Sequence, residues 1–194
     1  WYVPDNMTVV LVGDFDPRQA SRHIRQVFSR IPRESNPKRD IPMESVQEQP
    51  RSIILQKPFD NTYLALGFPI VSFDHPDTPA LDVLFSIIGS GRSSRLTQRI
   101  VEEAQLATSL GASDYTPEHS GLAIVSATVT AEKLPLALPE ILTELYRLRT
   151  EPVTREELQK AKTRIASSAA YEKQSFGGIA RKLGFYPVSY THLR

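Results

Sequence analysis

The segment Leu106–Val129, LATSLGASDYTPEHSGLAIVSATV, contains two apolar runs that are typical of neighbouring β-strands. The runs cover residues 106–113 and 122–129, and the turn-rich string DYTP (residues 114–117) lies between them. Consecutive strands with a short connection pair in the antiparallel sense. We therefore expect an antiparallel strand pair in this part of the chain.

Further strands are expected upstream of this segment. The β-branched run TVVLV (Thr8–Val12) indicates a buried strand, and residues 53–57 and 62–68 indicate two more, joined by the string PFDN. Apolar residues at helical spacing occur between and after these strands. They predict a helix beginning at Pro17 with Asp16 as its N-cap, and further helices around 79–88, after Ser93 or Ser94, over 136–149, and from the capping box TREE (residues 154–157) onward.

This order of elements predicts an α+β fold with two layers, in which helices pack on one face of an antiparallel-rich mixed sheet. We divide the chain into a strand–helix segment (1–31), a proline- and charge-rich linker (32–50), and a truncated main body (51–186). The tail 187–194, PVSYTHLR, fits no element and is interpreted as non-native. The opening WYVP lacks an initiator methionine, so the chain is interpreted as a fragment.

Composition excludes several functional classes. The 194 residues include 23 Lys and Arg against 22 Asp and Glu, and the resulting net charge of +1 argues against nucleic acid as the main partner. The absence of cysteine excludes disulfides, thiol catalysis and cysteine-bound zinc. No apolar run approaches the roughly 18–20 residues of a membrane span. The cellular compartment is not determined by these features.

Residues suited to catalysis are sparse. The four histidines stand at positions 23, 75, 119 and 192, and none has a partner at the spacing of H-x-x-E-H or H-E-x-x-H, so we predict no metal site. The string GSGRSSR (residues 89–95) offers Gly89, Gly91 and Arg92 as candidate binding residues, because a glycine turn before a helix exposes N–H groups. The alternative interpretation, a structural hinge with a serine cap, is the favoured one.

Four strings in order resemble the M16 family of zinc metallopeptidases, the insulinase, pitrilysin and mitochondrial-processing-peptidase group. They are YVPDNMTVVLVGDFDP (2–17), LGFP with DHPD (66–77), the glycine–SSRL region (84–107), and PVT to AK (152–162). Each string alone is weakly specific, but together they span residues 1–186 in the family's order. The resemblance is to the C-terminal-type domain of the family.

This resemblance implies a parent enzyme that hydrolyses peptide bonds with one zinc ion, which is held by an H-x-x-E-H helix and a later glutamate in the preceding domain. The ligands would then lie outside this chain, which we expect to bind no zinc and to be inactive alone. The implied partners are a peptide or small protein substrate, the preceding M16 domain, and a homologous domain or partner subunit. In processing peptidases a glycine-rich substrate loop precedes the Ser-Arg-Leu string, where Gly89 and Gly91 stand here.

Some family members also contribute an Arg–Tyr pair from a domain of this type. The matching positions are Val101 and Thr108, which lack the required side chains, so the pair would come from elsewhere. The sequence thus favours a chamber-forming domain of an M16-like endopeptidase. The alternatives are a non-catalytic scaffold or partner subunit of an M16-like complex, or an unrelated α+β binding module.

Overall fold

The computed structural model describes residues 3–32, 42, 45 and 47–189 of the chain. It divides into two units, Trp1–Ser45 with Ser168–Arg194, and Val46–Ser167. Helix α4 (Arg155–Glu172) runs across this division. The predicted linker lies mostly outside the described residues, so the domain boundaries stay a prediction.

In the first unit, a 3-10 turn, η1 (Pro4–Asn6), precedes helix α1 (Pro17–Phe28). The predicted start of α1 is confirmed, because the Asp16 Oδ1 accepts hydrogen bonds from the backbone N–H groups of Arg18 (2.7 Å) and Gln19 (3.0 Å). Helix α5 (Phe176–Ser189) extends into the segment interpreted as a tail. The rest of that segment, residues 190–194, lies outside the described residues.

Two predicted strands are wrong. Residues 8–12 and 53–57 form no strand, and most of their apolar side chains are exposed, including Leu11 at 52% and Ile54 at 87%. A strand requires a neighbour to bond its backbone groups, and no described strand pairs with either run. Prediction from apolar and β-branched composition alone therefore gave more strands than the structure has in these residues.

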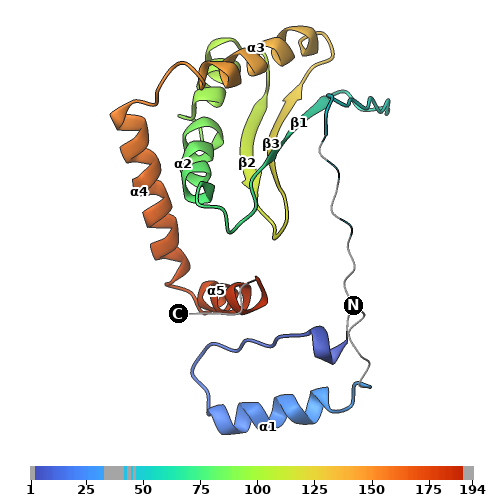
Figure 1. Ribbon diagram of the computed structural model, residues 1–194, viewed down its shortest axis with the longest axis vertical. Helices are drawn as coiled ribbons and strands as arrows, with labels where there is room; N and C mark the ends of the chain where they lie inside the picture. Colours follow the sequence, from blue (N-terminus) through green and yellow to red (C-terminus); the bar gives the residue numbers. More distant parts are fainter. Residues whose placement is uncertain (1–2, 33–41, 43–44, 46, 190–194) are drawn as a thin grey trace. The chain divides into compact units, whose positions relative to one another are not determined.

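The second unit is built on a three-stranded antiparallel sheet (Figure 1). Its strands are β1 (Thr62–Ile70), β2 (Ser109–Tyr115) and β3 (Gly121–Val129), in the order β1-β3-β2. The quoted segment thus supplies the central strand and one edge, and the described strands include no parallel pair. The predicted α+β fold with an antiparallel sheet is confirmed.

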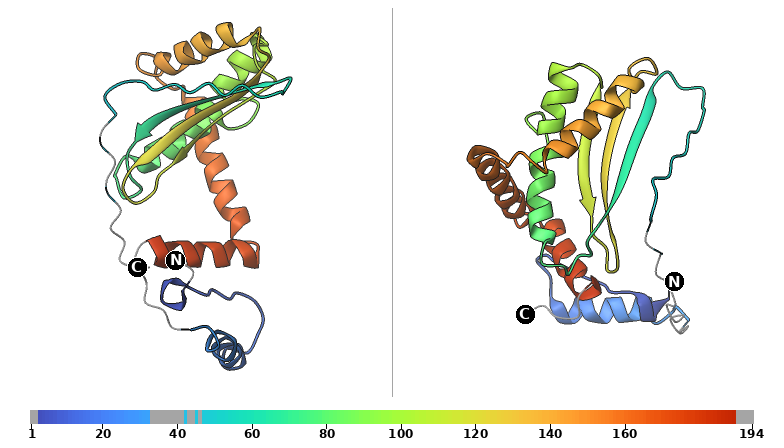
Figure 2. Two further views of the ribbon diagram at one scale, coloured as in Figure 1. Left: turned by 90° about the vertical axis from the view of Figure 1, so that its right-hand side faces the viewer. Right: turned by 45° about the horizontal axis from the view of Figure 1, so that its top comes forward.

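Helices α2 (Thr78–Gly89) and α3 (Leu134–Arg147) pack on one face of this sheet (Figure 2). Alternate residues of β3 are buried, and those between them are more exposed, as expected for a sheet covered on one side. The helix-facing residues of β3 join side chains from the helices in one core, whose most buried large members include Leu96, Ile100, Val125, Val129 and Ile141. Each such burial contributes about 1.5–3 kcal/mol.

The helix predicted after Ser93 or Ser94 forms as a π-helix, η2 (Thr97–Glu103). The Ala104 N–H donates to the Arg99 carbonyl at 3.0 Å, which is the i to i−5 bond of a π turn. Of its three apolar residues, Leu96 and Ile100 are buried and Val101 is half-buried. The helix position was therefore predicted correctly, but its winding was not.

The end of α2 meets β2 at unusually close range. A Cβ added to Gly89 would lie 2.4 Å from both the Cβ and the backbone nitrogen of Ala112. We expect Gly89→Ala to lower the free energy of unfolding by about 2 kcal/mol, because backbone atoms cannot yield to the added methyl group. Urea unfolding followed by circular dichroism measures this.

Gly111→Ala is the matched control, since a Cβ at Gly111 meets nothing within 4 Å. Equal stability of the two variants would contradict the close approach of α2 and β2.

Candidate functional site

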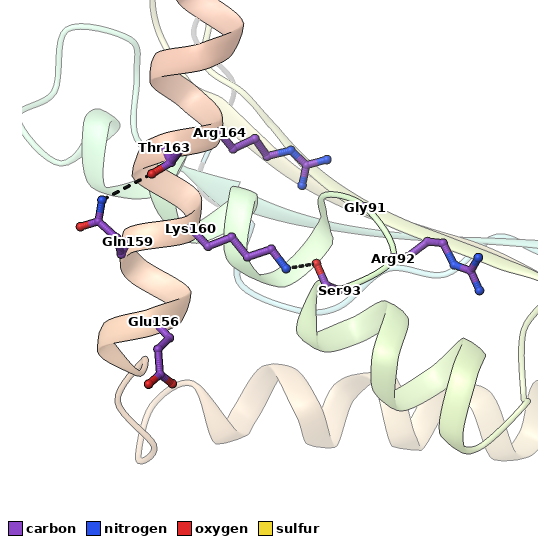
Figure 3. A pocket seen from close by; sticks show the side chains of 8 residues that line it. All are labelled: Gly91, Arg92, Ser93, Glu156, Gln159, Lys160, Thr163 and Arg164. Carbon is purple, nitrogen blue, oxygen red and sulfur yellow. Dashed lines mark hydrogen bonds between the residues drawn. The ribbon is translucent and has the colours of Figure 1, made fainter.

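A groove of about 750 Å³ lies between the loop after α2 and one face of α4. Its lining residues are Gly91, Arg92 and Ser93 from the loop, and Glu156, Gln159, Lys160, Thr163 and Arg164 from the helix (Figure 3). The helical residues share one face because positions three or four apart are neighbours on an α-helix. All of these residues belong to the unit Val46–Ser167.

The loop is tied to α4 by two hydrogen bonds. The Lys160 Nζ donates to the Ser93 hydroxyl, and the Arg164 guanidinium donates to the Ser90 carbonyl. Gly91 adopts a positive φ of 80°, the left-handed region that glycine tolerates best, and its missing side chain leaves room for the Arg164 guanidinium. The glycine turn thus lets the loop approach the helix.

Arg92 differs from the other two cations of the groove. Its side chain points away from α4 (Figure 3), and its Nη2 lies 3.0 Å from the Glu102 Oε1. Lys160 and Arg164 form no ion pair with any described carboxylate. The positive charge that remains available in the groove is therefore on α4.

A bidentate ion pair fixes the helix beside the loop. The Arg95 Nε and Nη2 donate to the two carboxylate oxygens of Glu157 at 2.6 and 2.7 Å. Glu157 also completes the predicted capping box, which is confirmed: it accepts from the Thr154 N–H at 2.7 Å, and its own N–H donates to the Thr154 hydroxyl. The hydrogen bonds from Arg95 are the main cause that lowers the pKa of Glu157 to about 2, and the hydrogen bonds with Thr154 lower it further.

A second hollow, of about 480 Å³, lies on the sheet. The β-ladder places the small residues Ala65, Ser126 and Gly111 side by side across β1, β3 and β2. Tyr63, 71% exposed, stands two residues from Ala65 on the same strand. None of the residues that line this hollow carries a charge.

The structure brings two of the three predicted binding residues into the groove. Gly91 and Arg92 line it, whereas Gly89 packs against Ala112 outside the lining. Sequence reasoning missed Lys160 and Arg164, although their spacing of four residues on a predicted helix places them on one face. Their proximity to residues 91–93 has no local sequence signal.

The described histidines do not assemble a metal site. The His75 Nδ1 accepts from the Asp77 N–H at 3.2 Å, and no group of three or more His, Asp or Glu side chains gathers anywhere in the described ranges. The side chains that the structure describes therefore do not fit a zinc ion.

Comparison with known proteins gives the family. The family model described as the peptidase M16 inactive domain matches residues 1–165. This chain belongs to the M16 inactive-domain family. The predicted resemblance is confirmed.

The relatives of this M16 domain are named zinc proteases. An uncharacterized zinc protease of Rickettsia felis is 32% identical over 140 residues, covering 68% of this chain and 34% of that protein. Zinc protease PqqE of Helicobacter pylori is 28% identical over 199 residues, covering 97% of this chain and 43% of that protein. The chain thus spans less than half the length of these relatives.

Solved structures share the fold of this M16 domain. A protease from Helicobacter pylori aligns with a TM-score of 0.72 at 23% identity, over 92% of this chain and 44% of that one. The M16 inactive domain from Pseudomonas fluorescens aligns with a TM-score of 0.68 at 24% identity, over 92% and 43% of the two chains.

In this M16 domain the two positions expected to lack the Arg–Tyr pair have structural contacts. Val101 packs against the core, and the Thr108 hydroxyl donates to the Thr128 carbonyl at 3.1 Å. No helix within the described residues is both long and apolar enough to cross a membrane.

Because of the Arg95–Glu157 pair, the free energy of unfolding should depend on pH in the acidic range. The folded-state pKa of Glu157, about 2, lies below its ordinary 4.5, so its contribution is complete above about pH 4.5 and is lost as the pH falls toward 2. We expect Glu157→Gln to cost about 1–2 kcal/mol at pH 7 and to flatten this part of the stability profile, as measured by urea unfolding.

The neighbouring Glu156→Gln variant is the control, because Glu156 forms no ion pair within the described structure. If the two variants have the same profile between pH 4.5 and 2, Glu157 does not carry the dependence.

Proposed function

We propose that this chain is the non-zinc-binding, C-terminal-type domain of an M16 zinc metalloendopeptidase, and that it forms part of the chamber that encloses a peptide or small protein substrate. Zinc would be held by the preceding M16 domain and would supply an activated water for peptide hydrolysis. A homologous domain or a partner subunit would complete the chamber. Within the described residues no group of three or more His, Asp or Glu side chains gathers, which supports placing the ligands in the preceding domain.

The observation that carries this proposal is the uncharged face of the sheet. The helices cover the other face, so the row Ala65, Ser126 and Gly111 is open to a ligand. Small side chains allow an extended peptide backbone to approach the sheet closely, and the absence of charge in the lining tolerates varied substrate side chains. A chamber wall needs both properties.

We also propose that the loop bearing Gly91 and Arg92 contacts substrate. Both residues line the groove and are exposed, which supports the role expected from their position before the Ser-Arg-Leu string. For Gly89 the same role is harder to support, because its packing against Ala112 explains the glycine by itself.

A non-catalytic scaffold subunit is the other function left open. The sequence of the domain that precedes this one distinguishes the peptidase from the scaffold. An H-x-x-E-H helix with a later glutamate in that domain supports the peptidase. A homologous domain without these ligands supports the scaffold.

The chain alone is expected neither to retain zinc stoichiometrically nor to hydrolyse peptides, because its described residues include no ligand set. Metal analysis of the purified chain after dialysis, with a fluorogenic peptide assay on the same sample, checks this. One tightly held zinc per chain would contradict it.

The chamber role predicts that a charge on the open sheet face impairs catalysis. We expect Ser126→Glu to lower kcat/KM for a peptide substrate about tenfold in the complete zinc protease that contains this domain. The reason is that a bound substrate peptide would remove water from the introduced carboxylate. Steady-state peptide hydrolysis measures this.

Ser167→Glu introduces the same change at an exposed position of α4 and should leave kcat/KM unchanged. Equal activity of both variants would show that the substrate does not contact this face of the sheet.

A further inference from the structure

We propose that the groove between residues 91–93 and α4 binds an acidic peptide segment, whose carboxylates are held by Lys160 and Arg164. This inference rests on the proposed peptide-contacting role of the loop and adds the chemical class of the ligand. It concerns binding by this chain directly, without zinc and without hydrolysis.

The two cations are held in position for such a ligand. Each donates a hydrogen bond to the loop, Lys160 to the Ser93 hydroxyl and Arg164 to the Ser90 carbonyl. A lysine has three donors and an arginine five, so both keep free donors at the exposed surface of the groove. Cations that are already ordered lose less entropy when they bind an anion.

The groove also contains the carboxylate of Glu156, but among the described residues it forms no ion pair with Lys160 or Arg164. Four arginines of the same unit each lie within 3.4 Å of a carboxylate oxygen: Arg92, Arg95, Arg99 and Arg147. Lys160 and Arg164 have no such partner among the described residues, although they are neighbours on one helix face and repel each other. A bound carboxylate would relieve this repulsion.

The other lining groups favour a peptide over a nucleic acid. None of the eight lining residues is aromatic, so bases would find no stacking surface. Ser93, Gln159 and Thr163 provide hydroxyl and amide groups that suit a peptide backbone. Glu156, at one end of the same helix face, would repel a continuous polyanion and thereby limit the acidic stretch.

The first test is fluorescence anisotropy with the full chain and a labelled, end-blocked glutamate-rich peptide. We expect the double variant K160Q/R164Q to weaken binding about tenfold. The matched double variant R155Q/K162Q removes the same charge from exposed positions of α4 and should bind as the parent chain does. Equal losses in both variants, or no binding by the parent chain, would overturn the proposal.

Two comparisons identify the ligand class. A glutamine-rich peptide of the same length should bind much more weakly; equal binding would show that the groove takes peptides without the acidic preference, which refutes this inference and leaves the proposed function intact. Single-stranded DNA that binds more tightly than the glutamate-rich peptide would also refute it.

A second measurement needs no variant. Lysine acetylation of the parent chain, read by mass spectrometry, should show that the glutamate-rich peptide protects Lys160 but not Lys162, which is also exposed. Equal protection of the two lysines would overturn the proposal even if K160Q/R164Q failed to fold.

Discussion

The Arg95–Glu157 ion pair joins two segments that are 62 residues apart in the sequence. Glu157 caps the first turn of α4 and at the same time accepts both bonds of the arginine fork, while Arg95 also donates to the Pro152 carbonyl. The start of α4 is therefore fixed beside the loop that follows α2. The groove lies between these two elements, and its cations Lys160 and Arg164 are held by their own hydrogen bonds to Ser93 and Ser90.

Small residues set the second constraint. Gly89 lets α2 end directly against Ala112 of β2, and small or β-branched residues on the buried side of β3 let the helices approach the sheet. On the opposite side, Ala65, Ser126 and Gly111 leave a shallow uncharged hollow. One sheet thus presents a packed face that stabilises the unit and a bare face that is free to meet a ligand.

These two surfaces suit different tasks in a member of the M16 inactive-domain family. The bare sheet face has no charge in its lining and offers backbone-sized space, which fits the proposed wall of a peptide chamber. The groove beside α4 carries two cations, Lys160 and Arg164, that form no ion pair among the described residues, which fits recognition of particular side chains. General accommodation and selective binding would then reside on separate elements of one unit.

The sequence alone determined the features that depend on neighbouring residues: the Asp16 cap, the capping box at Thr154, the alternation of β3, and the ordered strings that place the chain in its family. It could not decide whether residues 8–12 and 53–57 would be strands, because a strand forms only where a partner bonds its backbone. Nor could it place Lys160 and Arg164 beside residues 91–93. That proximity comes from a long-range ion pair and from close packing at glycines, which are properties of the folded chain.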